Sequence, residues 1–335
     1  MNTPFFLVDT ERIIVNYKKL KKELPVEQIF YATKPNNEEI TINTLKNINA
    51  SFEIVSSLEM KRLLELGVEE KNIICSLPIK KSIEIENLYK LGCRYFVYDD
   101  EKEYDKLIKI SPKAKKIARL SVTSISDNDI GFGLEISQLK EMILKNKKPD
   151  GYTFYLLNHN QWEKKLGTIF SWIQELLNFH DRSQEVTINI GGNYPIASQN
   201  NHNVYGKLTK MVNDIKSKCP NVHFIAEPGR SVINDAFSLV TTVIDVREND
   251  VYIDAHSQIL KIAPTQVDIS EKKKCKRRKV RFYETLCSQY ILFEKEIDYE
   301  ISIGMKLVLK SCGAYSICFS NNFHSTGKPE IVIDK

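Results

Sequence analysis

The chain has 335 residues, of which 42% are hydrophobic and 27% are charged. This length and composition predict about two domains, or one large barrel with an appendage, and exclude a mainly disordered protein. The net charge of +5 is too small to indicate a nucleic-acid partner, and no apolar run approaches the roughly 18 residues that span a bilayer.

The charges and the cysteines are unevenly placed. One run, from Lys272 to Lys279, holds seven of the positive charges, so the rest of the chain is net negative. The seven cysteines stand singly, without the spacing of a metal site, which is typical of reduced thiols in the cytoplasm. The first residues lack the basic flank and cleavage site of a signal peptide. We therefore expect a cytoplasmic protein with no membrane segment and no metal.

Short apolar runs alternate with amphipathic stretches over the first two thirds of the chain. Helical periodicity is clearest over residues 57–67 and 162–179. The strand-like runs are 29–34, 51–56, 72–77, 95–99, 116–121, 152–157, 186–192 and 223–228. Eight strands with helices between them predict an α/β fold, a closed (β/α)8 barrel of the TIM type over residues 12–234.

The pattern changes at about residue 235. The runs 238–246, 251–256, 279–286 and 305–313 are strand-like and are joined without a helical stretch. They predict a C-terminal β domain. The opening run, 4–9, precedes the first helix and is expected to complete this domain, which would then consist of residues 1–11 and 235–335.

Polar residues and glycines stand at the ends of three predicted barrel strands. Lys34 ends the first strand, Gly191 and Gly192 end the seventh, and Glu227 with Arg230 follows the eighth. Each has an ordinary interpretation, as a solvated lysine, a glycine turn or a turn with an ion pair. In a TIM-type barrel, however, the chemistry lies at these strand ends. Together they offer an amine, phosphate-binding N–H groups, a carboxylate and a guanidinium, which are the parts of a pyridoxal phosphate site.

These residues lie within motifs that follow a known order. The motifs are TPFFLVDTERIIVNYKKLKK, YATKPN, SFEIVSSLEMKRLLELGV, GFGLE, INIGGNYP, AEPGR and CGAYS. In this order the sequence resembles the fold-type III, pyridoxal-phosphate-dependent decarboxylases of ornithine, diaminopimelate and related amino acids. The resemblance covers nearly the whole chain. It implies a carboxy-lyase with a cofactor-binding barrel and a β domain built from both chain ends.

The resemblance implies a role for each matching residue. Lys34 matches the lysine that forms the internal aldimine, and Glu227 matches the carboxylate that pairs with the pyridine nitrogen and favours decarboxylation over racemisation. Cys287 matches a cysteine that is donated across a homodimer interface and protonates the quinonoid carbon, so the two subunits would share their active sites. The expected phosphate contacts are Gly191, Gly192, Gly229, Arg230 and Tyr315.

Several positions depart from the family. Tyr155 replaces the histidine that stacks on the ring, Asn158 replaces a phosphate-binding serine, and Asn193 replaces the third glycine of the loop. All three substitutions keep a group suited to cofactor binding. At the substrate's distal end, Asp254 matches an aspartate, whereas Ser288 stands where the family has an acid.

The lysine that pairs with such an acid is also absent, because Gly131 occupies its place. The sequence therefore predicts a substrate whose far end is neutral, anionic or joined to a carrier or a nucleotide, rather than free ornithine or lysine. The basic run 272–279 would lie near the active-site mouth and attract a phosphate-bearing carrier, or it would form an exposed, solvated hairpin loop. The sequence also leaves open whether a partner subunit completes the active site.

Three other functions remain to be separated from decarboxylation. An amino-acid racemase would use the same cofactor, but Glu227 and Cys287 argue against it. A catalytically silent regulatory homologue agrees with the missing acids and disagrees with the retained Lys34 and Arg230. A hydrolase without a cofactor would leave Lys34 and the glycines without a role.

Overall fold

The structure of the protein is a computed structural model that describes residues 2–123, 131–156, 162–194, 202–269, 273–286, 290–320 and 327–334. The chain divides into two compact units, which are described here one at a time. The barrel unit consists of Tyr17–Thr33 and Leu45–Gly229, and the sheet unit consists of Met1–Asn16, Lys34–Thr44 and Arg230–Lys335. The division predicted from the sequence, with its boundaries at residues 11/12 and 234/235, stays a prediction.

The barrel unit confirms the predicted (β/α)8 architecture. Its strands are β2 (Gln28–Ala32), β3 (Ser51–Ile54), β4 (Ile73–Cys75), β5 (Tyr95–Tyr98), β6 (Lys115–Arg119), β7 (Gly151–Thr153), β8 (Val186–Asn189) and β9 (Val222–Ala226). All eight are parallel, follow one another around the barrel in chain order and close where β9 pairs with β2. Each of the eight predicted strand runs corresponds to one of these strands.

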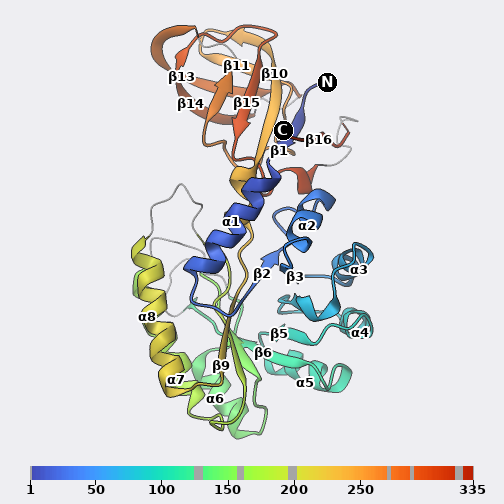
Figure 1. The fold of residues 1–335 in the computed structure, drawn as a ribbon, viewed down its shortest axis with the longest axis vertical. Coiled ribbons are helices and arrows are strands. Elements are labelled where there is room, and N and C mark those ends of the chain that lie inside the picture. The colour runs from blue at the N-terminus through green and yellow to red at the C-terminus, as the bar shows by residue number, and fades with distance from the viewer. Residues whose placement is uncertain are drawn as a thin grey trace. The chain divides into compact units, whose positions relative to one another are not determined.

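Helices alternate with the strands along the chain. They are α1 (Thr10–Glu23), α2 (Glu39–Lys46), α3 (Ser57–Glu65), α4 (Ser82–Lys90), α5 (Glu101–Ile110), α6 (Ile136–Leu144), α7 (Trp162–Leu177) and α8 (His202–Lys218), with a short 3-10 turn, η1 (Glu70–Asn72), before β4. Figure 1 shows α3, α4 and α5 on one side of the barrel strands and α7 and α8 on the other. Among the described residues, no helix is long and apolar enough to cross a membrane.

Local sequence explains where these helices begin. The Ser56 side chain accepts a hydrogen bond from the backbone N–H of Glu59 and caps α3, while Asp100 caps α5 in the same way at Glu103. Behind the cap, Met60 and Leu63 of α3 are buried because their spacing places them on one face of the helix. The helix is thus oriented with its apolar face inward.

The interior of the barrel is filled by side chains from alternate positions of its strands. One cluster of buried residues joins five strands and consists of Phe30, Ile74, Tyr95, Val97, Ile117 and Ile225. Such a packed interior leaves the strand ends and the loops after them as the places where a ligand binds.

The predicted strand runs continue past the carboxyl ends of the real strands. The run 186–192, for example, contains β8, which ends at Asn189, and the three following residues form the start of a loop. The apolar Ile190 extends the pattern, but the chain leaves the strand ladder as Gly191 takes a positive φ of 68°. The two glycines that were predicted to end the seventh strand therefore lie on the loop that follows β8.

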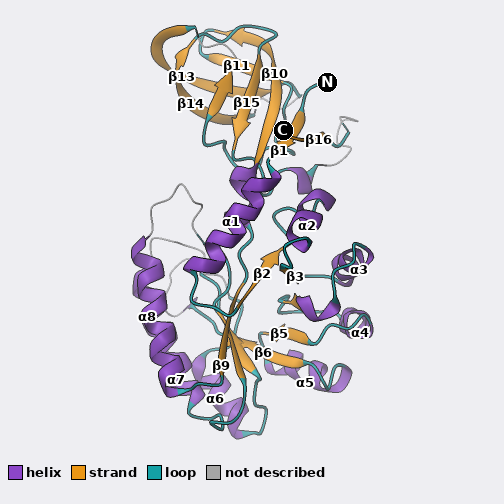
Figure 2. Ribbon diagram, in the orientation of Figure 1, coloured by secondary structure: helices purple, strands orange, loops and turns teal. Residues whose placement is uncertain are grey.

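The sheet unit confirms the predicted β domain and the role of the N-terminal strand. Strand β10 (Phe237–Arg247) pairs with β1 (Phe5–Val8), with β11 (Asp250–Ile253) and with β15 (Lys306–Lys310). The remaining elements are β12 (Val267–Ile269), β13 (Lys274–Glu284), β14 (Ile291–Tyr299), β16 (Glu330–Ile333), the short helix α9 (Arg230–Ile233) and the 3-10 turns η4 (Asn234–Ala236) and η5 (Ile317–Phe319). Figure 2 shows these strands as the dominant structure of the unit.

The interpretation of the basic run as a hairpin loop is wrong. Its described part from Lys274 onward belongs to β13, which pairs antiparallel with β14. Acidic residues make this arrangement possible, because Arg277 forms an ion pair with Glu296 and Lys279 forms one with Glu294. Opposite charges on neighbouring strands support pairing that a basic strand on its own would oppose.

Candidate functional site

Polar side chains gather at the carboxyl ends of three barrel strands. Ser76 follows β4, Asn189 is the last residue of β8, and Glu227 follows β9. Because the eight strands are parallel, these ends open on the same side of the barrel. Hydrogen bonds connect the three side chains to one another.

The carboxylate of Glu227 is held through one of its oxygens. Oε1 accepts a hydrogen bond from Asn189 Nδ2 at 2.6 Å and another from Ser76 Oγ. These are the hydrogen bonds that the described residues make to this carboxylate, so Oε2 remains as an acceptor for a ligand. Burial raises the pKa of Glu227, while the two donors and the charge of Arg119 act against this rise.

Asn189 links this carboxylate to the loop that follows β8. Its Oδ1 accepts a hydrogen bond from the backbone N–H of Gly191 at 2.9 Å. Its Nδ2 donates to Glu227 and also to the hydroxyl oxygen of Tyr95, at 3.0 Å. Burial and the nearby Glu227 charge raise the pKa of Tyr95 well above its ordinary value, so this hydroxyl is neutral.

The loop after β8 has no room for side chains at its two glycines. A Cβ on Gly191 would lie 2.5 Å from the Phe154 carbonyl oxygen, and one on Gly192 would lie 2.4 Å from the Glu227 carbonyl oxygen. Asn193 has a positive φ of 65°, the backbone conformation that the sequence required of it, and its Nδ2 donates to Leu156 O. A tight glycine turn that follows a barrel strand suits a phosphate group.

An aromatic ring and a cation lie near the ends of β6 and β7. Arg119 is the last residue of β6, and its guanidinium carbon is 5.9 Å from the centroid of the Tyr155 ring. The same group is 5.4 Å from the centroid of the Phe132 ring. Tyr155 is 37% exposed, and a tyrosine ring is of a type that stacks on a planar ligand.

Lys34 lies in the sheet unit, two residues after the end of β2, and its side chain is exposed. The chain directly after it is fixed by the segment 313–318. Pro35 O accepts a hydrogen bond from the N–H of Tyr315 at 2.8 Å, and the buried Asn36 donates from Nδ2 to Gly313 O at 3.0 Å. These bonds hold the backbone next to Lys34 while its amine remains exposed.

The other predicted site residues differ in their surroundings, and three of them are not described by the structure. Gly229 is buried, and Arg230 begins α9 in the sheet unit. Both Asp254 oxygens are already acceptors: Oδ1 binds Thr241 Oγ1 and Oδ2 binds Thr3 Oγ1, each at 2.5 Å. Its predicted contact with substrate remains a prediction, against which these bonds argue. Asn158, Cys287 and Ser288 lie outside the described residues.

Four residues of this region, Ser76, Tyr95, Arg119 and Asn189, were not predicted from the sequence. Arg119 and Asn189 are the last residues of buried strands, and Ser76 follows one directly. A search for every polar residue at the carboxyl end of a predicted strand would have found these three. Tyr95 begins its strand and gave no such signal, because an aromatic residue there is equally typical of the core.

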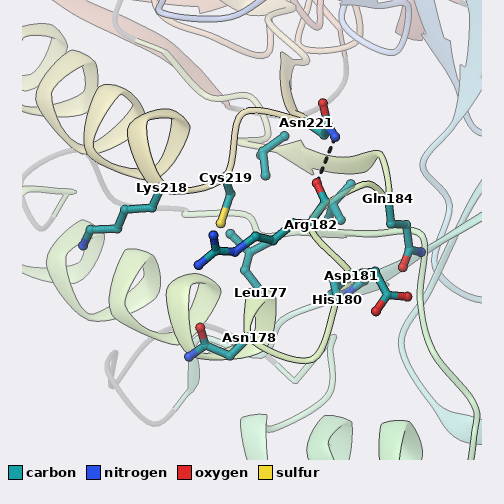
Figure 3. Close-up of a pocket in the computed structure, with 11 residues that line it drawn as sticks. Leu177, Asn178, His180, Asp181, Arg182, Gln184, Lys218, Cys219 and Asn221 are labelled. Carbon is teal, nitrogen blue, oxygen red and sulfur yellow. Dashed lines mark hydrogen bonds between the residues drawn. The ribbon is translucent and has the colours of Figure 1, made fainter.

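A separate pocket opens at the other end of the barrel unit. Its volume is about 470 Å³, and it lies between the end of α7 and the start of β8 and between the end of α8 and the start of β9. Figure 3 shows Arg182, Lys218 and Cys219 lining it, with Asn221 donating to Arg182 O. This pocket contains none of the predicted site residues. Within the described parts of the chain, no cluster of three His, Cys, Asp or Glu residues could hold a metal ion.

Comparisons with known proteins agree with this arrangement. Residues 10–152 match the family model described as "Pyridoxal-dependent decarboxylase, pyridoxal binding domain". The arginine decarboxylase of the Paramecium bursaria Chlorella virus, a crystal structure, superposes with a TM-score of 0.86 at 18% identity, covering 100% of this chain and 96% of that chain. At this level of identity, the likeness of the two structures shows the fold alone.

Two curated relatives extend the comparison. The lysine/ornithine decarboxylase of Selenomonas ruminantium is 26% identical over 260 residues, which cover 73% of this chain and 65% of the relative. Antizyme inhibitor 2 of Xenopus laevis is 24% identical over 258 residues, which cover 73% of this chain and 56% of the relative. The matched region thus spans less than two thirds of the length of each relative.

Proposed function

Because the chain belongs to the ornithine-decarboxylase-like, fold-type III family of pyridoxal-phosphate-dependent decarboxylases, we propose that it releases CO2 from an amino acid or an amino-acid derivative. One observation carries the proposal: Asn189 joins the Glu227 carboxylate to the Gly191 loop at the carboxyl ends of β8 and β9. A protein with no cofactor has no need to place a charged carboxylate and a side-chain-free loop together.

The residues of this region fit pyridoxal phosphate. When bound, the cofactor supplies an electron-poor ring that accepts the electrons left behind by departing CO2. Backbone N–H groups of Gly192 and Asn193 would bind its phosphate, while the N–H of Gly191 donates to Asn189 Oδ1 and holds the shape of the loop. Glu227 would accept a hydrogen bond from the ring nitrogen and would keep that nitrogen protonated.

The remaining roles follow the family pattern. Lys34 carries the amine that bonds to the cofactor, and the segment 313–318 holds its backbone in place. Arg230, Tyr315, Gly229 and Asn158 would complete the phosphate contacts, and the Tyr155 ring would stack on the cofactor. Cys287 of a second copy of the chain would supply the proton that replaces CO2 on the substrate.

The substrate differs from a free diamino acid at its far end. Ser288 and Gln289 follow Cys287, so this stretch offers no carboxylate to a distal ammonium group. An ammonium group placed there without a carboxylate would lose hydration without gaining a counter-ion. We therefore propose a substrate whose far end is neutral, anionic or joined to a carrier or a nucleotide.

Two further proposals concern assembly and compartment. A homodimer with shared active sites follows from the role of Cys287. The cysteines among the described residues are all free thiols, which supports a reducing compartment such as the cytoplasm.

Carbon dioxide release from a panel of amino acids tests the proposed function. The protein is loaded with pyridoxal phosphate and offered diamino acids, neutral and acidic amino acids, and phosphorylated conjugates. We expect CO2 release from a neutral amino acid, an acidic amino acid or a phosphorylated conjugate. The Lys34→Ala variant should release none. Release from free ornithine or lysine alone would contradict the proposed substrate class. Chiral analysis of unreacted amino acid separates decarboxylation from racemisation.

A regulatory function is the second candidate, because Antizyme inhibitor 2 is among the relatives. A regulator acts through binding and does not need a lysine amine or a charged ring partner. Cofactor loading therefore separates the two: a protein that binds no pyridoxal phosphate at saturating concentration would favour the regulator, and its interaction partners would then be the target of study.

A further inference from the structure

The pocket at the ends of α7 and α8 is walled by backbone that is held in place (Figure 3). A hydrogen bond from the Gln184 N–H to Asp181 O, at 2.9 Å, closes the turn after α7. Asn221, just before β9, donates from Nδ2 to Arg182 O at 2.9 Å, and its own carbonyl oxygen accepts from the N–H of Val186 at 3.2 Å. The backbone that carries Arg182 is therefore tied to the starts of β8 and β9.

The side chain of Arg182 is exposed, and its guanidinium makes no hydrogen bond or ion pair with a described residue. Figure 3 shows this side chain extending past Cys219, while the Asp181 side chain points away from it. A guanidinium presents pairs of N–H groups whose spacing matches the two oxygens of a carboxylate. The pocket thus offers a bidentate donor that the described part of the chain leaves unpaired.

The inner wall of the pocket is apolar. Leu177, Val186 and Val222 line it, and each has 6% or less of its surface exposed. The hydrocarbon part of an organic acid gains free energy by packing against such a wall, whereas an inorganic anion gains nothing from it. The volume of about 470 Å³ is in the range of small-molecule sites.

The charges around the pocket favour a ligand with one negative charge. Arg182 and Lys218 are positive and Asp181 is negative, so one positive charge is in excess. Burial lowers the pKa of His180, which also lines the pocket, to about 4, so its ring is neutral near pH 7. Lys218 is the last residue of α8, where it offsets the partial negative charge of the helix end. Arg182 is then the cation that remains for a ligand.

We propose that this pocket binds a small organic monocarboxylate with an apolar body, whose carboxylate pairs with Arg182 while its hydrocarbon part packs on the inner wall. The site is separate from the candidate active site, because it lies at the starts of β8 and β9, whereas Asn189 and Glu227 stand at their ends. The inference goes beyond the proposed function and does not depend on it.

The test measures the binding of benzoate by isothermal titration calorimetry at low salt, in the presence of pyridoxal phosphate. Two other probes separate the parts of the proposal. Benzamide has nearly the same shape as benzoate without its charge, and inorganic phosphate has charge without an apolar body. Each probe is titrated into wild type and into the variants.

The variants separate the two cations of the pocket. Arg182→Gln removes the guanidinium, Arg182→Lys keeps the charge without the paired donors, and Lys218→Gln removes the other cation. Arg62→Gln is the matched control, because Arg62 is an exposed arginine of α3, on the other side of the barrel strands from α7 and α8 (Figure 1).

We expect benzoate to bind at one site per chain, and benzamide and phosphate to bind more weakly by about tenfold. Arg182→Gln should weaken benzoate binding by about tenfold and Arg182→Lys by a few fold, since an ammonium group does not make two parallel bonds. Lys218→Gln should have a smaller effect than Arg182→Gln, and Arg62→Gln should have none.

Three results overturn the inference. One is the absence of saturable benzoate binding. Another is equal affinity for benzoate and phosphate, which would mean that the apolar wall contributes nothing. The third is a benzoate affinity that Arg182→Gln leaves unchanged, which would place the ligand elsewhere on the protein. Because the Arg182 side chain bonds to no described residue, the variant is expected to fold, and a melting temperature equal to that of wild type without probe checks this.

Discussion

At the scale of single residues, the proposed function depends on the carboxylate of Glu227, whose charged form is disfavoured by burial. Burial raises the pKa of Glu227, so the folded chain holds its proton more tightly than the unfolded chain does. The donors Ser76 and Asn189 reduce this cost without removing it. A charge kept under these conditions is expected to serve the ligand rather than the fold.

The variant Glu227→Gln separates these two requirements. Activity should fall by about a hundredfold or more, because the ring nitrogen loses its charged partner. Stability should change in the opposite direction. A carboxyl group with a raised pKa stabilises the fold at low pH, and this contribution is lost as pH rises from the ordinary value of 4.5 through the folded value.

The melting temperature of the cofactor-free protein measures the stability effect. At pH 8 we expect Glu227→Gln to melt above wild type, whereas at pH 4 the difference should shrink. A variant that melts below wild type by the same amount at both values would show that burial of the charge carries no cost.

The residues of the site were only partly predictable from the sequence. Lys34, Glu227 and the glycine loop stand in motifs with chemical meaning, and the geometry of the loop, including the positive φ of Asn193, agrees with expectation. Asn189 lies within the motif INIGGNYP, but the family resemblance assigns it no role. Its importance arises from the pairing of β8 with β9, a contact that sequence spacing does not reveal.

At the scale of elements, apolar strands were predictable and charged ones were not. The barrel strands are buried on both faces, so their apolar runs stand out. Strand β14, in contrast, contains Glu294, Lys295, Glu296 and Asp298 and is not among the strand-like runs predicted from the sequence. Its acidic residues are compensated by the basic residues of β13. The sequence of one strand alone does not show these ion pairs, because each pair needs a residue from both strands.

The basic strand offers a test of substrate recruitment. Lys274 and Lys276 are exposed and form no ion pair with a described residue, whereas Arg277 and Lys279 are paired with acids. If the lysines attract an anionic conjugate, Lys274→Gln with Lys276→Gln should lower kcat/KM for that substrate by a few fold at low salt.

High salt should remove this difference, because it screens exposed charges. Arg277→Gln with Lys279→Gln is the matched control and should have a smaller effect, since the charges it removes are already compensated. Equal kcat/KM for wild type and the lysine variant at both salt concentrations would rule out recruitment by this strand.

The connection between α7 and β8 carries a second pH effect. Burial lowers the pKa of His180 from 6.5 to about 4, and its Nε2 is 2.8 Å from the Tyr152 hydroxyl oxygen. Because the unfolded chain binds this proton more readily, stability is full above pH 6.5 and is lost as pH falls toward 4.

The variant His180→Gln cannot titrate in this range and should lose less stability on acidification. Melting temperatures at pH 7 and pH 4.5 measure the effect: wild type should fall further than the variant between the two. The same fall in both proteins would contradict a titrating role for His180.

At the scale of the whole molecule, the proposed shared site predicts complementation between inactive variants. Lys34→Ala and Cys287→Ala would each inactivate both sites of a homodimer. In a mixture that has exchanged subunits, a mixed dimer regains one intact site, so activity should return to about a quarter of wild type for equal amounts and random pairing.

The same variants mixed without subunit exchange are the control and should stay inactive. No recovery after exchange, with mixed dimers demonstrated by mass, would mean that Lys34 and Cys287 of one site come from the same subunit.

The central claim is that this chain holds pyridoxal phosphate on Lys34, and one measurement tests it most directly. The absorbance spectrum of the protein with pyridoxal phosphate is recorded before and after borohydride reduction, and the reduced adduct is located by peptide mapping. We predict a visible band that reduction abolishes and an adduct on Lys34. The absence of a band at saturating cofactor, or an adduct only on other lysines, would contradict the account and direct the search toward binding partners.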